Sequence, residues 1–424
     1  MKKFLALIIA LVMALSLVAC GEQKQPDTPD VPDDGEQTAT IKVGFITLHD
    51  ENSTYDLNFI NAAKEAIANL GLTENDYILK TNIEEGQKCY DTAAELADAG
   101  CNIIFADSFG HESYMIQAAK DFPDVQFCHS TGTRAHTENL PNYHNAFASI
   151  YEGRYLAGIA AGMKMNEMIE AGKFTADEAK MGYVGAFTYA EVVSGYTSFY
   201  LGAKSVCPTV TMDVTFTGSW YDETLEKEGA QKLIDGGCKL ISQHADSLGA
   251  PTACENAGIP NVSYNGSTQA AGPNTYIISS RIDWAPYYEM AIKAVMDGTE
   301  IPVDYTGDLK TGSVVLTDLN TAVAAEGTQA AIDEAMTKLE NGELHVFDCS
   351  TFTTSVEANP FKTDYLTVDA DGHITSYLAD VDTDEAYAGD TEVITSGYFS
   401  ESTARSAPYF DLSIDGINLL DTKM

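Results

Sequence analysis

The sequence has few basic residues and none of the short motifs that mark the common enzyme classes. It carries 24 Lys and Arg against 63 Asp and Glu, which gives a net charge of −39. A chain this acidic is repelled by phosphate backbones, and this excludes nucleic acid as a partner. No G-x-G-x-x-G, Walker, H-E-x-x-H or G-x-S-x-G pattern occurs. The sequence therefore offers no positive case for an enzyme or for a bound cofactor.

Paired cysteines and metal-ligand spacings are also missing. Of 8 cysteines, all but Cys20 are scattered singly, with no C-x-x-C pair. The odd number that remains argues against a complete disulfide framework. We therefore expect these cysteines to be small residues of the core. A disulfide between some pair of them is the alternative. The acidic runs at 369–371 and 380–384 lack the Gly and Glu positions of a calcium loop, and the histidines follow no ligand spacing. We expect no metal site.

The N-terminus has the pattern of an export signal. Lys2 and Lys3 precede an apolar run at 4–19, shorter than the ~20 residues of a membrane-spanning helix. The run ends in "LVAC", which is the pattern that lipoprotein signal peptidase recognises. We predict a signal peptide at 1–19 and lipidation of Cys20. The alternative is an ordinary secretory signal followed by an incidental cysteine.

Residues 20–40 are rich in acidic residues and proline and contain little apolar surface. Such a segment cannot bury enough surface to order itself, so we predict a lipid-anchored acidic tether. The body from residue 41 onward is longer than one hydrophobic core usually holds, which predicts two or three domains. This layout is typical of an extracytoplasmic receptor that is anchored to the cell membrane by lipid.

The body alternates short apolar strands with longer helical segments, a pattern that predicts parallel sheets covered on both faces. The first series has strands at 41–48, 77–83, 102–108, 125–130 and 145–150, and helices at 58–70, 86–99 and 112–121. The pattern restarts with a helix at 151–165. It continues with strands at 180–186, 209–217, 239–244, 260–265 and 274–280, and helices at 191–206, 223–236 and 248–258. The fold class is therefore α/β, with two doubly wound lobes in tandem.

The last third of the chain is expected to cross back between the lobes. We assign residues 41–150 plus about 284–300 to lobe one, and residues 151–283 plus about 310–345 to lobe two. We predict a helix at 328–341 and a β-rich C-terminal extension at 346–424. Within it, "LTVDADGHITSYL" predicts a hairpin that turns at Asp371 and Gly372.

The segments that follow the strands carry the binding chemistry, because ligands of open α/β sheets lie beyond the carboxyl ends of the strands. Both tryptophans, Trp220 and Trp284, fall in such segments, as do Tyr55, Phe109 and Phe187. Aromatic faces with nearby carboxylates and hydroxyls suit a flat, partly polar ring, and each stack contributes roughly 1–3 kcal/mol. The alternative is that these rings only pack the edges of the lobes.

Several blocks are similar to one known family. "YEGRYLAGIAAGMKM", "EVVSGYTSFYLGAKSV", "GSWYDE", "QHADSLGAP" and "IDWAPYY" resemble the Bmp (basic membrane protein) family of ABC-transporter substrate-binding lipoproteins. The resemblance spans about residues 41–320. It implies a type I periplasmic-binding fold with a hinge between the lobes, permease subunits as partners, and purine nucleosides or nucleobases as ligands. It also implies contacts from Tyr55, Asp56, Asn58, Ser108, Phe109, Gly110, Phe187, Trp220 and Asp246.

Two positions depart from the family pattern. Where nucleoside-binding members often carry an aspartate-bearing motif, this chain has Asn265 after Tyr264, and near the family's lysine it has Asp283, followed by Trp284. An aspartate in place of a lysine favours a ligand that donates hydrogen bonds. We therefore expect Asp246 and Asp283 to face one cleft and to favour a free base or another nitrogen-rich ring.

The sequence thus predicts a monomeric receptor for an ABC importer that closes on a purine base or nucleoside and has no catalytic turnover. Three other functions remain possible at this point. The same fold could feed a sensor kinase or chemoreceptor, or could bind another heterocycle such as a flavin. A nucleoside hydrolase-like enzyme would release free base. A surface adhesin would leave the aromatic residues of the cleft without a role.

Overall fold

The computed structural model describes residues 41–357, 359–361, 364–381 and 391–422. The predicted signal peptide, Cys20 and the tether lie outside these residues. None of the helices in the described ranges combines the length and apolar character needed to cross a membrane.

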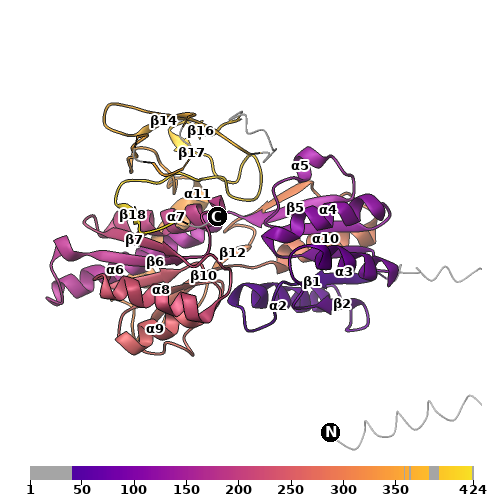
Figure 1. The fold of residues 1–424 in the computed structure, drawn as a ribbon, viewed down its shortest axis with the longest axis horizontal. Coiled ribbons are helices and arrows are strands. Elements are labelled where there is room, and N and C mark those ends of the chain that lie inside the picture. Colours follow the sequence, from indigo (N-terminus) through magenta and orange to yellow (C-terminus); the bar gives the residue numbers. More distant parts are fainter. Residues whose placement is uncertain (1–40, 358, 362–363, 382–390, 423–424) are drawn as a thin grey trace, which may run out of the picture. The chain divides into compact units, whose positions relative to one another are not determined.

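The first sheet has the strand order β11-β5-β4-β3-β1-β2, and every neighbouring pair is parallel. Figure 1 shows β1, β2 and β5 of this sheet among the helices of the first lobe. Its strands are β1 (Val43–Ile46), β2 (Tyr77–Lys80), β3 (Ile103–Ala106), β4 (Gln126–Ser130), β5 (Tyr143–Ala148) and β11 (Asp304–Gly307). Helices cover both of its faces, and the apolar side chains packed between helices and sheet form two buried clusters. These helices are α2 (Thr54–Asn69), α3 (Gln87–Asp98), α4 (Glu112–Asp121), α5 (Ala135–Glu138) and α10 (Ala285–Asp297).

The second sheet has the order β12-β10-β9-β8-β6-β7-β18, and only β12 runs antiparallel to its neighbour. Its strands are β6 (Lys180–Gly185), β7 (Thr211–Phe216), β8 (Leu240–Gln243), β9 (Asn261–Tyr264), β10 (Tyr276–Ile282), β12 (Val314–Leu316) and β18 (Ile417–Leu419). Its helices are α6 (Ile150–Glu170), α7 (Ala190–Val206), α8 (Glu223–Asp235), α9 (Gly249–Ala257) and α11 (Thr328–Asn341).

The α/β fold class with two doubly wound parallel sheets is confirmed. Helix α10 packs into the core of the first lobe, and β12 pairs with β10 of the second. Strand β11 lies in neither of the ranges expected for the lobes, yet it extends the first sheet beside β5. Its sequence, "DYTG", is too short and too polar to be recognised as a strand, because it is a half-buried edge strand.

Helices α6 and α7 approach each other at glycines. A Cβ added to Gly158 would lie 2.1 Å from the carbonyl oxygen of Phe199, and one added to Gly202 would lie 2.0 Å from that of Tyr155. The two contacts are reciprocal, so each helix presents a glycine to the backbone of the other. This close packing explains the small residues that the sequence concentrates in both helices.

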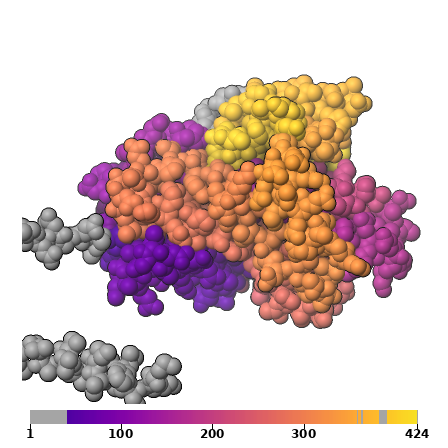
Figure 2. Space-filling view, turned by 180° about the vertical axis from the view of Figure 1, so that it is seen from behind, coloured from indigo at the N-terminus to yellow at the C-terminus, as the bar shows by residue number. Residues whose placement is uncertain are grey.

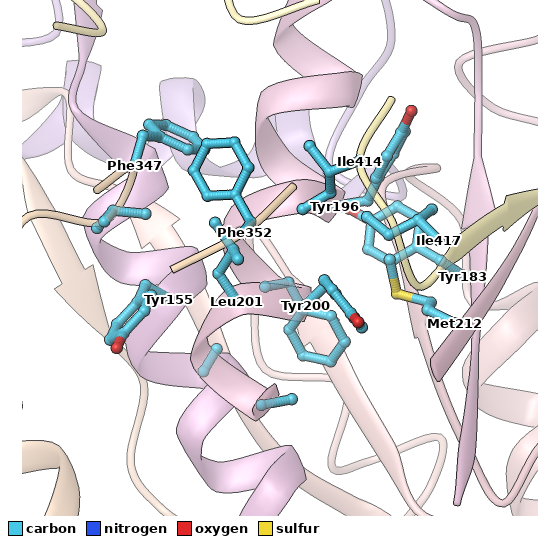
Figure 3. Close-up of a cluster of buried hydrophobic side chains, with 14 of the residues drawn as sticks. Tyr155, Tyr183, Tyr196, Tyr200, Leu201, Met212, Phe347, Phe352, Ile414 and Ile417 are labelled. Carbon is cyan, nitrogen blue, oxygen red and sulfur yellow. The ribbon is translucent and has the colours of Figure 1, made fainter. Parts of the chain in front are cut away.

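The C-terminal extension is built onto the second lobe. Phe347, Phe352 and Ile417 pack in one buried cluster with Tyr196 and Tyr200 of α7 (Figure 3). The cysteines of the described chain, seven in number, are all buried and free. The extension contains β13 (Leu366–Val368), β14 (Ile374–Ala379), β15 (Thr391–Glu392), β16 (Ile394–Thr395) and β17 (Tyr398–Phe399), and its last strand, β18, joins the second sheet.

The hairpin predicted in the extension is confirmed. Strands β13 and β14 pair antiparallel, and Gly372 takes a φ of +91° in the turn between them. The Asp369 carboxylate accepts hydrogen bonds from the backbone N–H groups of Asp371 and His373, both at 2.9 Å. The acidic run therefore forms a turn, as a local Asp side chain commonly does.

The extension also contacts the first lobe. The backbone N–H of Ser406 donates to the Asp304 carboxylate at 3.1 Å, and the Thr306 hydroxyl donates to the carbonyl oxygen of Ser402 at 3.3 Å. Asp304 and Thr306 belong to β11. Figure 2 gives the opposite view, in which the yellow extension and the orange residues that precede it form a continuous surface.

Candidate ligand-binding cleft

A pocket lies where the strand ends of the two sheets meet. Loops after β1, β3 and β4 supply its wall from the first lobe, and loops after β6, β7, β8 and β9 supply the other wall. Both walls thus stand at the carboxyl ends of parallel strands, where ligands of open α/β sheets bind. The lining side chains are Leu48, His49, Tyr55, Asp56, Ser108, Phe109, Thr131, Glu191, Trp220, His244, Asp246, Tyr264 and Asn265.

Asp56 is a buried carboxylate held in place by its neighbours. Its oxygens lie 2.7 Å from the backbone N–H of His49 and 3.3 Å from the His49 ring Nδ1. Ser53 caps helix α2 by accepting from the Asp56 N–H at 3.2 Å, which fixes the backbone. Burial alone would raise the pKa of Asp56, but the hydrogen bonds from His49 and Ser53 lower it overall. Asp56 is therefore a charged acceptor.

Asp107 is a buried residue that directly follows β3. One oxygen accepts from the Leu48 N–H at 3.1 Å, and the other has no hydrogen-bond partner within the described chain. Burial raises the pKa of Asp107 well above its usual range, and the charge of Asp56 raises it further. Its carbonyl oxygen accepts from the Tyr55 hydroxyl at 2.8 Å, which holds that ring against the pocket.

Asp246 joins the two lobes through its backbone. Its carbonyl oxygen accepts from the N–H of Thr54 at 3.0 Å and from the Thr54 hydroxyl at 3.1 Å, and Thr54 begins helix α2 of the first lobe. Its carboxyl accepts from the Asn265 amide at 3.3 Å. Burial raises the pKa of Asp246 well above its usual range, and the nearby charges of Asp56, Glu226 and Glu191 act in the same direction.

A chain of hydrogen bonds runs from the core of the second lobe to the pocket. Buried Arg154 donates to the Tyr183 hydroxyl, which lies 3.2 Å from Nδ1 of His244. His244 Nε2 lies 2.9 Å from the Glu191 carboxylate. Where the Tyr183 hydroxyl donates to Nδ1, the Nε2–H of His244 donates to the Glu191 carboxylate. One carboxylate oxygen of Glu191 is thereby engaged at the pocket wall.

Tyr264 links Arg154 to the pocket in a second way. The guanidinium carbon lies 4.7 Å from the centre of the Tyr264 ring, and the His244 ring lies 4.7 Å from it as well. The Tyr264 hydroxyl is buried and finds no partner among residues the structure describes. An unsatisfied buried hydroxyl is costly, so a ligand atom that bonds to it gains affinity.

Aromatic rings from both lobes form the outer rim of the pocket. Phe109 of the first lobe stacks on Tyr189 of the second, with ring centres 5.0 Å apart. Phe187 meets Trp220 edge to face at 5.1 Å and stacks on Tyr189 at 5.2 Å. Glu85 fixes the loop that carries Phe109, since it accepts from the Ser108 hydroxyl at 2.6 Å and from the Gly110 N–H at 2.8 Å.

The structure gathers most of the residues expected from the sequence. Those that line the pocket are Tyr55, Asp56, Ser108, Phe109, Trp220, Asp246 and Asn265. Three others support this lining without belonging to it. The Asn58 amide lies 3.4 Å from the Asn265 oxygen, Phe187 backs Trp220, and Gly110 positions the Phe109 loop through Glu85.

Asp283 and Trp284 are not brought to the pocket, and this corrects the expectation that Asp283 faces Asp246. The Asp283 carboxylate pairs with Arg281 at 3.1 Å and accepts from the first N–H of helix α10 at 3.1 Å. Trp284 is 2 % exposed and stacks on Phe59 at 4.5 Å in the first lobe's core. The second carboxylate near Asp246 is Asp56 instead.

Sequence reasoning missed six lining residues, all within or beside the segments that follow strands. No single one stood out, because histidine, threonine and glutamate in a loop carry no spacing signal. Only the fold shows which of these side chains turn toward the pocket. The missed residues are Leu48, His49, Thr131, Glu191, His244 and Tyr264.

Two doubly wound lobes with a polar, aromatic-lined pocket between their strand ends define the solute-binding class of protein. A family model described as "ABC transporter substrate-binding protein PnrA-like" (Bmp) matches residues 44–346. The chain belongs to this family. It is therefore an extracytoplasmic substrate-binding protein of an ABC transporter, a class that binds small molecules and interacts with permease components. The family consists of solute-binding proteins rather than enzymes.

Individual proteins agree with this assignment. The chain is 32% identical over 310 residues to a purine-binding protein of Brucella abortus, covering 72% of this chain and 83% of that protein. It is 34% identical over 259 residues to a putative ABC transporter glucose-binding protein of Haloferax volcanii, covering 61% and 62%. A solved solute-binding protein from Conexibacter woesei shares the fold, with a TM-score of 0.58, 23% identity, and coverage of 72% and 98%.

Proposed function

We propose that this protein is the receptor of an ABC importer and that it captures a purine base or nucleoside in the pocket between its lobes. One observation carries the proposal. Aromatic rings and carboxyl groups line the same small pocket, with Phe109 and Trp220 beside Asp56, Asp246 and Glu191. The name of the Brucella relative, a purine-binding protein, supports the same ligand class.

The carboxyl groups match the edge of a purine. Asp56 is charged and accepts hydrogen bonds from ring N–H or exocyclic amino groups. Asp246, whose pKa is raised by burial, can carry a proton and so both donate to a ring nitrogen and accept from an amino group. A purine edge presents donors and acceptors side by side, whereas its faces stack on aromatic rings.

Glucose is the rival ligand, because the Haloferax relative is named as a putative glucose-binding protein. Two measurements separate these cases: mass spectrometry of ligand released from natively purified protein, and calorimetry with purines, nucleosides, flavin and glucose. We expect a purine or nucleoside to bind with a dissociation constant of about 1 μM, a binding free energy of about −8 kcal/mol. Tight glucose or flavin binding without purine binding would reject the proposal. Recovery of intact nucleoside after incubation is expected, and released base would indicate an enzyme.

We further propose that lipid on Cys20 anchors a monomeric receptor to the cell membrane through the acidic tether. Cys20→Ser is expected to abolish lipidation and to release the protein or leave it with an uncleaved signal, because the thioether forms only with sulfur. Labelled palmitate and cell fractionation measure this. Label that persists in the Ser variant contradicts the anchor. Deletion of the neighbouring permease genes, with uptake as the readout, separates transport from delivery to a sensor kinase or chemoreceptor.

A further inference from the structure

Arg154 is a charged side chain that lies inside the second lobe rather than on its surface. It belongs to α6, is 0% exposed, and is not among the residues that line the pocket. Its guanidinium carbon lies 5.3 Å from the centre of the Tyr183 ring, 5.6 Å from that of Phe199 and 4.7 Å from that of Tyr264. These aromatic faces hold the cation in place. Because burying a charge is costly, an arginine in this position calls for an explanation.

The bond between Arg154 and Tyr183 fixes the direction of the tyrosine hydroxyl. Nη2 donates to that hydroxyl, whereas Nε and Nη1 find no acceptor in the described part of the chain. A guanidinium carries donors only, so the Tyr183 oxygen accepts. Burial raises the pKa of Tyr183 above its ordinary value, and the hydroxyl therefore keeps its proton. That proton is left to point at the other neighbour, Nδ1 of His244, at 3.2 Å.

The same direction continues through His244 to the pocket. With Nδ1 accepting, the ring donates through Nε2 to the Glu191 carboxylate at 2.9 Å. Two further contacts keep the ring in place. The backbone N–H of His244 donates to the carbonyl oxygen of Val184 at 2.8 Å, and a Cβ added to Gly195 would lie 3.0 Å from the ring's Nδ1. His244 is thus packed against α7, the helix that also carries Glu191.

We propose that Arg154 is a positioning residue of the binding site, although it does not line the pocket. Through Tyr183 and His244 it fixes how the Glu191 carboxylate is held at the pocket wall. Each link of the chain donates toward the cleft, and the first link cannot be reversed, because a guanidinium cannot accept a hydrogen bond. The effect on ligand binding rests on the proposed function, whereas the direction of the chain does not depend on any ligand.

Nitrogen NMR of the ligand-free protein tests this direction, since protonated and unprotonated ring nitrogens of histidine give well-separated signals. The signals of His244 are those lost in His244→Gln. We expect Nδ1 to be unprotonated and Nε2 to be protonated in the wild type. In Arg154→Met the Tyr183 oxygen is free to accept, so about a tenth or more of the molecules should carry a proton on Nδ1. Arg154→Lys keeps a charged donor and should restore the wild-type signals. A wild type with a proton on Nδ1, or an Arg154→Met protein with wild-type signals, overturns the proposal.

Calorimetry shows whether Arg154 acts on binding through Glu191. The probe is whichever of adenosine, guanosine and inosine binds the wild type most tightly. Arg154→Met should weaken its binding about tenfold, but less than about threefold in a Glu191→Gln background, since a residue that acts through another has no separate effect. Tyr183→Phe breaks the chain in the middle and keeps the ring. It should behave in the same way, and it replaces Arg154→Met if that variant fails to fold.

Tyr196→Phe is the matched control for Tyr183→Phe. Tyr196 is also fully buried, its ring lies 5.8 Å from that of Tyr183, and its hydroxyl has no partner among the residues described. This variant should leave the His244 signals and the binding unchanged. Equal losses in the wild-type and Glu191→Gln backgrounds would mean that Arg154 only supports the fold, and would overturn the proposal. A wild type that binds none of the three nucleosides overturns the proposed function, and the NMR result then decides the direction of the chain by itself.

Discussion

Replacing Gly202 by alanine is expected to destabilise the second lobe by about 2 kcal/mol or more, although alanine is the better helix former. The added Cβ would lie 2.0 Å from the carbonyl oxygen of Tyr155 and 2.8 Å from its carbon. Both are backbone atoms of α6, so no side chain can move aside to make room. The two helices must separate, and the apolar packing on either side of the contact loosens with them.

Gly229→Ala is the matched control in α8. Its Cβ would meet Val184 at 3.4 Å and Thr215 at 3.5 Å, which are ordinary contacts. Alanine at this helix-interior position should stabilise the protein by about 0.5–1 kcal/mol, so the two substitutions should have opposite signs. Chemical denaturation of both variants measures this. A neutral or stabilising Gly202→Ala would mean that α6 and α7 do not pack at this distance.

The regular elements of the fold could be predicted from the sequence because each carries a complete local signal. The helix expected at 328–341 is α11 (Thr328–Asn341), and the one expected at 223–236 is α8, which begins after its capping residue Asp222. Strands β11 and β18 carry no such signal. They are short edge strands whose existence depends on the neighbour they pair with, β5 in one case and β7 in the other.

The site could be predicted at the level of segments but only partly at the level of residues. The rule that ligands bind beyond the strand ends selected the loops, and Tyr55, Phe109 and Trp220 followed from it, whereas Asp246 came from the family resemblance. The direction of each side chain depends on packing that is distant in sequence. Trp284 lies in a selected segment, but Phe59, far away in the chain, provides the surface on which it stacks.

The extension could not be given a role from sequence for the same reason. Its apolar residues Phe352 and Ile417 are spaced without a period, because they fill gaps left on α7 rather than forming a face of their own. Its charged residues bond to backbone groups that are brought near by the fold, as Arg405 does with Val381. Only the three-dimensional arrangement places this segment beside the cleft.

Asp246→Ala is expected to weaken binding of the preferred purine ligand about ten- to a hundredfold, the effect of losing a charge-assisted or buried hydrogen bond. The Asp246 carboxyl lines the pocket, and among the described residues it accepts a hydrogen bond from the Asn265 amide at 3.3 Å, which leaves capacity to bind a ligand. Asp56 stands as the second carboxylate of the site, so a nucleotide's phosphate should be repelled. Nucleotides are therefore expected to bind far more weakly than the matching nucleoside.

The competing explanation is that Asp246 caps the following helix, where alanine would cost about 1 kcal/mol of stability and leave binding unchanged. The geometry favours binding, since Ser247 rather than Asp246 accepts from the Gly249 N–H, at 3.0 Å. Asp222→Ala provides the control, because Asp222 caps α8 by accepting from Leu225 at 2.9 Å. Melting temperature and dissociation constant are measured for both variants. Asp246→Ala should lower affinity, whereas Asp222→Ala should lower only the melting temperature. An Asp246→Ala protein with a lower melting temperature and wild-type affinity would show that Asp246 is a helix cap. Tight nucleotide binding by the wild type would contradict the claim that Asp56 and Asp246 both face the ligand.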